Sequence, residues 1–256
     1  MMNFFKYQGT GNDFIMVDNR SGEWNNLSNK TITALCDRRF GIGADGLIKI
    51  NSAENVDFEV DYYNSDGSKS FCGNGARCSV AFAHFLKIFN DSKTVFTAID
   101  GLHEAEIKGE IVKLKMSDVK TILKDGNDSV LNTGSPHFIK YVNDIADVNV
   151  FEEGKLIRYS ENYKEQGINV NFVEEISDEQ IFVRTYERGV EDETYSCGTG
   201  ATAAALTYLD KNSTNQIAVK TLGGDLKVYA EKNNNSFVNI WLEGPAKQVF
   251  SGQISI

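Results

Sequence analysis

Cysteine and proline are scarce in this chain, and long apolar runs are missing. Only four of the 256 residues are Cys and two are Pro. Four cysteines in a chain of this length do not make a disulfide framework, so we expect free thiols in a reducing compartment. No stretch approaches the roughly 18 apolar residues that a membrane span requires, and no basic segment followed by an apolar run opens the chain. The sequence therefore predicts a cytoplasmic protein with no membrane partner.

An excess of positive charge is also missing. The formal net charge is −10, and no cluster of Lys and Arg offsets it, so the chain would repel a polyphosphate backbone. We therefore expect no nucleic-acid partner. With 41% hydrophobic and 24% charged residues, the chain can bury a sizeable core as one large domain or two small ones.

An internal repeat organises the chain. Residues 72–76 read Cys-Gly-Asn-Gly-Ala, and residues 197–201 read Cys-Gly-Thr-Gly-Ala, about half a chain length later. Each copy follows an alternating apolar run that predicts a strand, and leads into an apolar segment that predicts a buried helix. These strands are 58–63 and 181–186, the helices are 74–89 and 199–209, and further strands are predicted at 15–18, 46–50, 105–116, 217–230 and 237–242. The predicted fold class is α+β, with two pseudo-symmetric domains, each a sheet wrapped around a central buried helix, and the active site in the cleft between them.

The two repeated cysteines suggest proton transfer at a stereocentre. Inversion needs a base on one face of the carbon and an acid on the other, because a single group tends to return the proton to the face it left. A Cys just before a helix lies beside unpaired backbone N–H groups and the positive end of the helix dipole, which favour thiolate. Lowering a Cys pKa from about 8.5 to about 7 requires roughly 2 kcal/mol, near the upper end of that effect. We therefore predict Cys72 and Cys197 as the acid and base, and Cys36 and Cys78 as buried core residues.

The same helix starts indicate a reaction that needs no cofactor. Backbone N–H groups there can stabilise a substrate carboxylate while the α-proton leaves, and the second thiol stays protonated because two nearby thiolates repel. No phosphate-binding loop or Schiff-base Lys is signposted, so we expect no pyridoxal phosphate. A metal site is not expected either, because the spacing of Cys72 and Cys78 is not that of a usual zinc knuckle.

Four separated segments carry a more specific pattern. They are 9–14 (Gly-Thr-Gly-Asn-Asp-Phe), 64–67 (Asn-Ser-Asp-Gly) leading to 71–78 (Phe-Cys-Gly-Asn-Gly-Ala-Arg-Cys), 134–137 (Gly-Ser-Pro-His), and 186–189 (Tyr-Glu-Arg-Gly) leading to 197–201. In this order they resemble the diaminopimelate epimerase family over essentially the whole chain. The resemblance implies an isomerase that converts LL- to meso-2,6-diaminopimelate without a cofactor, for lysine and peptidoglycan precursor synthesis, and that forms a homodimer. It also implies an N-terminal half at 1–118, which the strand 249–256 joins, and a C-terminal half at 119–248.

The resemblance also implies roles for individual residues. Cys72 and Cys197 would be the acid and base, and His137 and Glu187 would assist beside them. The groups that bind the substrate would be Asn12, Asn64, Gly73, Asn74, Asn169, Glu187, Arg188, Gly198 and Thr199. Among them, Arg188 would bind the distal carboxylate, because a guanidinium fork matches a carboxylate.

Three positions depart from the family pattern. Ser135 stands where many members have Asn, the loop 189–196 is one residue longer than the commoner form, and Gly46 stands where some members have a Gln contact. Ser135 changes one hydrogen bond to the substrate, and the extra residue changes the geometry of the loop. Gly46 has no side chain for the Gln contact, so we do not predict that contact.

Three other functions remain open from the sequence. One is a related two-cysteine racemase, of proline, hydroxyproline or a broader range of amino acids, although Asn74, Arg77 and the Glu187-Arg188 pair favour diaminopimelate. Another is a cysteine hydrolase that uses one Cys with His137, which would form an acyl-enzyme. The last is a non-catalytic amino-acid binding protein, whose ligand affinity would survive replacement of either Cys by Ala.

Overall fold

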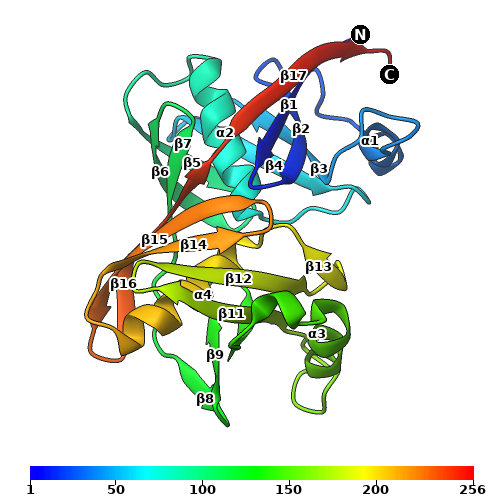
Figure 1. Cartoon of the computed structure of the whole chain (residues 1–256). Coiled ribbons are helices and arrows are strands. Elements are labelled where there is room, and N and C mark those ends of the chain that lie inside the picture. The colour runs from blue at the N-terminus through cyan, green and yellow to red at the C-terminus, as the bar shows by residue number, and fades with distance from the viewer. The chain divides into compact units, whose positions relative to one another are not determined.

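The computed structural model describes residues 1–256 and divides them into two compact units (Figure 1). Unit 1 consists of Met1–Leu114 and Gly244–Ile256, and unit 2 consists of Lys115–Glu243. Each unit combines a mixed sheet with two α-helices. The prediction of an α+β fold with two repeated domains is confirmed, and the repeat extends to the order of the strands, as the next two paragraphs show.

Unit 1 is a sheet with two parallel crossovers. Its elements are β1 (Met2–Gly9), β2 (Asn12–Asp18), α1 (Asn29–Cys36), β3 (Gly46–Asn51), β4 (Phe58–Asn64), α2 (Gly73–Phe85), β5 (Lys93–Ala98), β6 (Gly101–Lys108), β7 (Ile111–Lys115) and β17 (Lys247–Ile254). The strands pair in the order β17-β1-β2-β3-β4-β5-β6-β7, and every pair is antiparallel except β2 with β3 and β4 with β5. A parallel pair needs a crossover connection, and α1 and α2 supply these two.

Unit 2 repeats this topology. Its elements are β8 (Leu123–Asp125), β9 (Asp128–Asn132), β10 (Pro136–Tyr141), the 3₁₀ helix η1 (Ile145–Asp147), α3 (Val150–Arg158), β11 (Asn169–Ser177), β12 (Gln180–Glu187), β13 (Asp192–Thr194), α4 (Gly198–Lys211), β14 (Gln216–Thr221), β15 (Gly224–Asn233) and β16 (Ser236–Pro245). Again every pair is antiparallel except two, β10 with β11 and β12 with β14. The crossover connections of these two parallel pairs contain α3 and α4, respectively. Thus β2, β3 and β4 correspond to β10, β11 and β12, and α2 corresponds to α4.

The central helices are buried because their sequences are apolar or small on all sides. α2 is buried from Gly73 to Ala83, and α4 is buried at Gly198 and from Gly200 to Leu209. α2 packs against β1, β2, β3, β4 and β6, and α4 against β9, β10, β11, β12, β14 and β15. Each sheet therefore wraps around its helix, as the sequence predicts, and holds the start of that helix in a fixed place.

Several predicted boundaries were wrong. α2 ends at Phe85, four residues before the predicted end, because Lys87 takes a positive φ of 57° and the Ile88 N–H bonds back to the Ala83 carbonyl in a Schellman-type stop. The predicted strands 105–116 and 217–230 are each two strands of a hairpin, which turn at Gly109 and just before Gly224.

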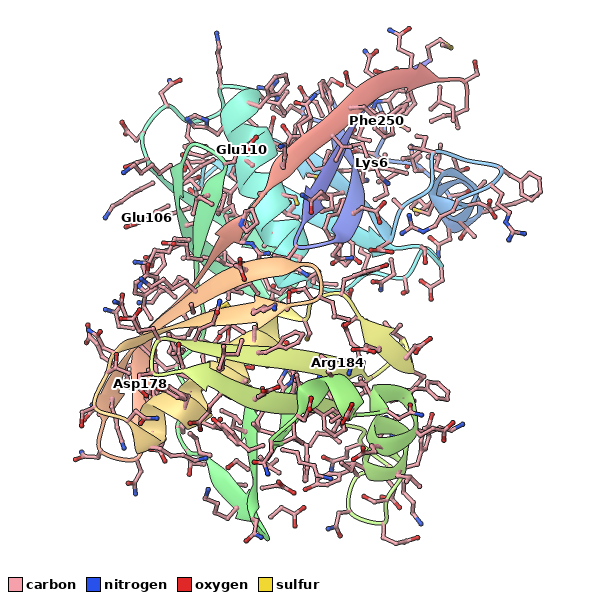
Figure 2. The ribbon with its side chains drawn as sticks, viewed as in Figure 1. Lys6, Glu106, Glu110, Asp178, Arg184 and Phe250 are labelled. Carbon is pink, nitrogen blue, oxygen red and sulfur yellow. The ribbon has the colours of Figure 1, made fainter.

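The last strand, β17, lies beside the first and pairs with it antiparallel from Met2 opposite Ile254 to Gln8 opposite Lys247. Phe250, labelled on β17 in Figure 2, meets Phe4 of β1 edge to face, with ring centroids 6.0 Å apart. Such pairs add about 0.5–1.5 kcal/mol beyond the burial of their area. The C-terminal segment is therefore held in unit 1 by both backbone and side-chain contacts.

Candidate active site

The repeated topology gathers polar residues at one edge of each sheet. Parallel neighbours start at the same edge, and an antiparallel third strand ends there. In unit 1 these ends are Asn12 (start of β2), Gly46 (start of β3) and Asn64 (end of β4); in unit 2 they are His137 (second residue of β10), Asn169 (start of β11) and Glu187 (end of β12). The register agrees, because Gly46 pairs with Asn64 and His137 with Asn169. Equivalent strand ends of the repeat therefore supply five of the side chains that the sequence singled out, namely Asn12, Asn64, His137, Asn169 and Glu187.

The cysteines occupy the start of each central helix. Cys72 is the N-cap of α2 and Cys197 is the N-cap of α4, and neither side chain caps the helix by a hydrogen bond. By contrast, the side chains of Ser28 and Asn149 accept backbone N–H bonds at the starts of α1 and α3. The first turns of α2 and α4 contain no acidic residue. Their backbone N–H groups thus form the kind of helix terminus that binds an anion or favours a thiolate.

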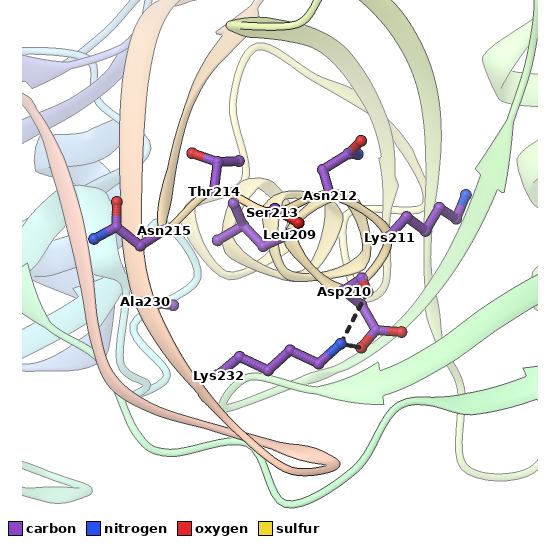
Figure 3. Close-up of a pocket in the computed structure, with 9 residues that line it drawn as sticks. All are labelled: Leu209, Asp210, Lys211, Asn212, Ser213, Thr214, Asn215, Ala230 and Lys232. Atoms are coloured by element: carbon purple, nitrogen blue, oxygen red, sulfur yellow. Dashed lines mark hydrogen bonds and ion pairs between the residues drawn. The ribbon is translucent and has the colours of Figure 1, made fainter.

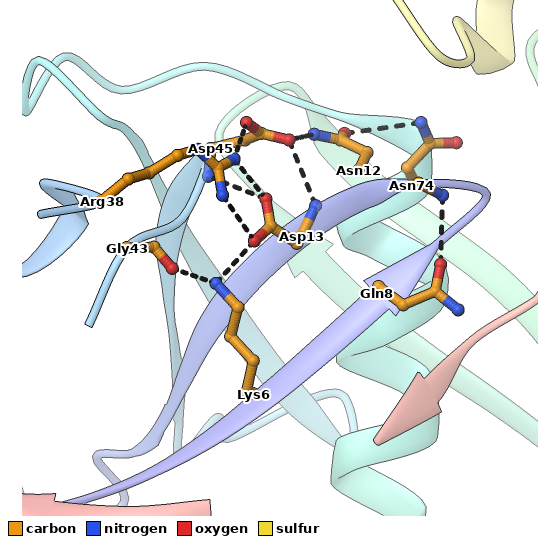
Figure 4. Close-up of polar contacts among 9 residues, drawn as sticks. Lys6, Gln8, Asn12, Asp13, Arg38, Gly43, Asp45 and Asn74 are labelled. Carbon is orange, nitrogen blue, oxygen red and sulfur yellow. Dashed lines mark hydrogen bonds and ion pairs between the residues drawn. The ribbon is translucent and has the colours of Figure 1, made fainter. Parts of the chain in front are cut away.

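In unit 1, the Asp45 carboxylate holds the Asn12 amide, as Figure 4 shows. Asn12 Nδ2 donates to Asp45 Oδ2 at 2.5 Å, so Asn12 Oδ1 faces Cys72 Sγ at 3.3 Å and Asn74 Nδ2 at 3.4 Å. Asp45 is held in turn by Arg38 Nη2 at 2.6 Å and by the Asp13 N–H at 3.2 Å. Asn12, Cys72 and Asn74, which the sequence predicts as site residues, therefore form one cluster.

Removal of the Asp45 carboxylate is expected to impair this cluster. In Asp45→Ala, the Asn12 amide loses its anchor and can rotate, and misplacement of a site group by about 1 Å can lower a rate by about 10²-fold. We expect kcat/KM for diaminopimelate, the substrate that the resemblance implies, to fall by about that factor. Asp18→Ala is the matched control, because Asp18 pairs with the exposed Arg20 outside the cluster. Equal kcat/KM values for the two variants would show that Asp45 is not needed to position Asn12.

Asn64 is positioned by the loop that follows β4. Its Nδ2 donates to Ser68 Oγ at 2.9 Å, its Oδ1 accepts from Ser70 Oγ at 3.1 Å, and the next residue, Ser65, bonds through its N–H to the Asp45 carbonyl. Gly46 leaves no room for a side chain, since a Cβ there would lie 2.4 Å from the Tyr63 carbonyl oxygen. The family contact at position 46 is thus sterically excluded here.

In unit 2, Thr199 links Cys197 to His137. Thr199 Oγ1 lies 3.5 Å from Cys197 Sγ and 2.9 Å from His137 Nε2, and Thr133 Oγ1 donates to the Thr199 carbonyl at 2.8 Å. His137 is fully buried. Burial, followed by the positive charge of Arg188, lowers the pKa of His137 to about 3, so the imidazole is neutral at physiological pH. Cys197, Thr199 and His137 form the second cluster.

The predicted substrate-binding residues of β11 and β12 are held by Ser135. Asn169 Nδ2 donates to Ser135 Oγ at 2.9 Å and its Oδ1 accepts the Arg188 N–H at 2.9 Å, while Arg188 Nη2 donates to Ser135 Oγ at 3.3 Å. The hydroxyl that replaces the family Asn therefore takes part in the network. Arg188 is exposed, and its Nη1 donates a hydrogen bond to the Gln166 carbonyl at 3.0 Å.

The longer loop before Cys197 forms an ordered hairpin. β13 pairs antiparallel with the end of β12, and Thr194 Oγ1 donates to Glu187 Oε2 at 3.0 Å. Arg184, labelled on β12 in Figure 2, binds both oxygens of Glu193 at 2.7 and 2.8 Å. In the turn of this hairpin, Gly189 and Glu191 have positive φ.

Besides Asp45, two residues that contact these clusters, Arg77 and Asn171, were not predicted from the sequence as site residues. Arg77 is fully buried in α2, where its Nη2 donates to Asn74 Oδ1 at 2.9 Å and to Thr10 Oγ1 at 3.2 Å, while Nε and Nη1 have no hydrogen-bond partner. Asn171, two residues after Asn169 on β11, contacts His137. The sequence did offer a signal for each. Arg77 is a charged residue in an apolar helix, and Asn171 lies on the same strand face as Asn169.

The other cysteines lie outside these clusters. Burial raises the pKa of Cys36 to about 11 and that of Cys78 to about 12, which confirms both as core thiols. A hollow of about 570 Å³ lies at the C-terminal end of α4. Asp210 and Lys232, labelled in Figure 3, line it and form an ion pair at 2.9 Å. A helix of 14 residues is about 20 Å long, so this hollow is remote from Cys197. No group of three or more His, Cys, Asp or Glu side chains is arranged to hold a metal ion, and no helix is long and apolar enough to cross a membrane.

Known proteins are similar to this chain in fold and in sequence. A phenazine biosynthesis protein of the PhzF family from Bacillus anthracis superposes with a TM-score of 0.74 at 15% identity, covering 100% of this chain and 99% of that one. The duplicated α+β unit thus places the chain in the class of proteins with the two-domain fold of diaminopimelate epimerase and PhzF-like proteins.

Sequence similarity specifies the family within this class. The diaminopimelate epimerase family model matches residues 4–122 and 129–249. The chain is 49% identical over 257 residues to the diaminopimelate epimerase of Flavobacterium psychrophilum, covering 99% of this chain and 100% of that protein. It is 43% identical over 258 residues to that of Chlorobaculum tepidum, covering 97% and 99%. The chain belongs to the diaminopimelate epimerase family, and the predictions of family and of an isomerase are confirmed.

Proposed function

We propose that this enzyme interconverts LL- and meso-2,6-diaminopimelate without a cofactor, with Cys72 and Cys197 as the acid and base. The observation that carries the proposal is the pair of equivalent helices in the repeat, each of which begins at a Cys and lacks a side-chain cap. Two equivalent proton-transfer groups suit a reaction that must run in both directions between two epimers. Membership of the family supplies the substrate class.

The proposed reaction transfers one proton on each face of the α-carbon. The thiolate of one Cys removes the α-proton, and the thiol of the other Cys delivers a proton to the opposite face. Negative charge that develops on the α-carboxylate is stabilised by the first N–H groups of the two helices, at Gly73 and Asn74 and at Gly198 and Thr199. In the reverse direction the two sulfurs exchange roles.

The remaining predicted residues would hold the substrate and align it. Arg188 suits the distal carboxylate, since its guanidinium is exposed and its position is set by Asn169 and Ser135. Asn12, Asn64 and Glu187 offer amide and carboxylate oxygens to the ammonium groups. His137 and Glu187 would assist from beside the cysteines. These contacts would distinguish diaminopimelate from the shorter substrates of a proline or hydroxyproline racemase.

The test is proton NMR of LL-diaminopimelate in deuterated water with the purified enzyme and no added cofactor. We expect the meso isomer to appear with deuterium at one α-carbon. Proline and trans-4-hydroxyproline are measured in parallel. Exchange with these compounds alone would assign the protein to the racemases, and a trapped acyl-enzyme in its mass spectrum would assign it to the hydrolases.

Other parts of the proposal concern the setting of the enzyme. We propose a cytoplasmic homodimer that serves lysine and peptidoglycan precursor synthesis, with functional halves at 1–118 and 119–248 and with 249–256 joined to the first half. The pairing of β17 with β1 supports the last assignment. Light scattering of the purified protein tests the dimer, since a monomeric mass at micromolar concentration would contradict it.

A further inference from the structure

Asn171 is a buried amide whose orientation is determined by its partners. Its Nδ2 lies 3.1 Å from the Phe138 carbonyl oxygen, which can only accept, so this atom is the amide nitrogen. Its Oδ1 accepts from Thr185 Oγ1 at 3.0 Å. Asn171 is 0% exposed, and Gly200 leaves space for it, because a Cβ at Gly200 would lie 2.3 Å from Asn171 Oδ1.

This orientation determines which nitrogen of His137 carries the proton. Asn171 Nδ2 also lies 3.1 Å from His137 Nδ1 and presents a hydrogen to it, so Nδ1 of the neutral ring must be the acceptor. The proton of the ring is therefore on Nε2, which lies 2.9 Å from Thr199 Oγ1. His137 donates to the Thr199 hydroxyl and cannot accept from it.

The Thr199 hydroxyl then has its own proton available for the sulfur of Cys197. Its oxygen already accepts from His137, and Cys197 Sγ lies 3.5 Å away, within hydrogen-bond range for sulfur. We propose that Asn171 is a positioning residue that holds His137 in the Nε2–H tautomer, so that the Thr199 hydroxyl donates to Cys197 Sγ and favours its thiolate. This inference rests on the proposed function, because it specifies how one of the two thiols is prepared for proton transfer.

The proposal changes the role of His137. A histidine beside a cysteine is usually considered as the base that deprotonates it, but here the ring is neutral, donates from Nε2, and acts through Thr199. Glu187 ends β12 opposite Asp192 of β13, Arg188 follows β12 directly, and the first turn of α4 has no acidic residue. The positive charge of Arg188 opposes protonation of His137 and so maintains the donor chain.

The contact on Cys72 has the opposite polarity. Asn12 Oδ1 can only accept, so it bonds to the protonated thiol of Cys72, whereas the Thr199 hydroxyl can donate to a thiolate. Cys72 also has the buried Arg77 as an electrostatic neighbour. We therefore restrict the proposal to Cys197 and use Cys72 as an internal reference.

The first test is ¹⁵N NMR of the histidine rings at neutral pH. The chain contains only three His, and His137→Gln assigns the resonances of residue 137. We expect an unprotonated Nδ1 and a protonated Nε2 for His137. The opposite tautomer, or an imidazolium, would overturn the proposal.

The second test is the pH dependence of alkylation by iodoacetamide, followed for each Cys by mass spectrometry of its peptide. Loss of one hydrogen bond to a charged group should raise the apparent pKa of Cys197 by about one unit, which is about tenfold less thiolate at a given pH below the pKa. We expect this shift in Thr199→Val and a much smaller one in Thr199→Ser, which keeps the hydroxyl. Thr207→Val, a buried Thr later in α4, is the matched control and should leave Cys197 unchanged.

Asn171→Ala extends the test to the positioning residue itself. It should raise the apparent pKa of Cys197 in the same direction while the profile of Cys72 stays as in the wild type. If this variant does not fold, the test rests on the comparison of Thr199→Val with Thr199→Ser. Equal pH profiles of Cys197 alkylation in these two variants would overturn the proposal. Neither readout needs turnover, so failure of diaminopimelate as a substrate and failure of the hydrogen-bond chain are distinguishable.

Discussion

Replacement of either Cys72 or Cys197 by Ala is expected to lower the rate of LL-to-meso conversion by about 10³-fold or more. Positioned acid and base groups typically contribute 10²–10⁴-fold each, and inversion needs both. The measurement is the initial rate of meso formation by NMR or by a stereospecific coupled assay. Cys36→Ala is the control, since Cys36 is a core thiol whose pKa burial raises to about 11. It should retain the wild-type kcat.

The two alanine variants should also differ from each other in a way that a one-base enzyme would not. Each keeps one thiol, so each can still remove the α-proton from one epimer and return solvent deuterium to the same face. We expect slow α-proton exchange from LL-diaminopimelate in one variant and from the meso isomer in the other, in both cases without inversion. Exchange of both epimers by one variant would contradict the two-base mechanism.

Gly200→Ala is expected to destabilise the protein by about 2–4 kcal/mol, although Ala is normally the better helix former. The new Cβ would lie 2.3 Å from Asn171 Oδ1 and 3.3 Å from Cys197 Cβ. Asn171 cannot move aside without losing its bonds to Phe138, Thr185 and His137. For a chain of this size we expect a decrease in Tm of roughly 5–10 °C by calorimetry, together with a rise in the apparent pKa of Cys197.

The repeat provides the control for this variant. Gly75 occupies the position in α2 that Gly200 occupies in α4, and a Cβ there would lie 3.1 Å from Ile48 Cδ1, the end of a flexible side chain that can shift. Gly75→Ala should therefore change Tm by less than half as much. A larger effect at Gly75 than at Gly200 would show that the fixed Asn171 amide is not the obstacle.

The sequence was sufficient to predict those features of the site that short sequence motifs encode. The repeated Cys-Gly-x-Gly-Ala pattern correctly placed Cys72 and Cys197 at helix starts, because Gly after a Cys and an apolar segment beyond it have a local meaning. The same pattern predicted the duplicated α+β fold. The general tendency of a free Cys to be buried correctly assigned Cys36 and Cys78 to the core.

The contacts that orient the site depended on tertiary structure. Asp45 lies 33 residues from Asn12 along the chain, and Asn171 lies 34 from His137; each pair meets only because parallel strands begin at the same edge of a sheet. Helices α1 and α3, which make those crossovers, were not predicted, since they are short and gain most of their stability from packing.

The sequence by itself therefore determined the family, the two-domain fold and the position of Cys72 and Cys197 at two helix starts, because each is encoded by a short motif or by its repetition. Only the tertiary structure decided which way the amides of Asn12 and Asn171 point, and hence which contact donates to a sulfur and which accepts. The physical reason is that hydrogen-bond direction is a property of a closed set of partners, and those partners come from separate strands and helices.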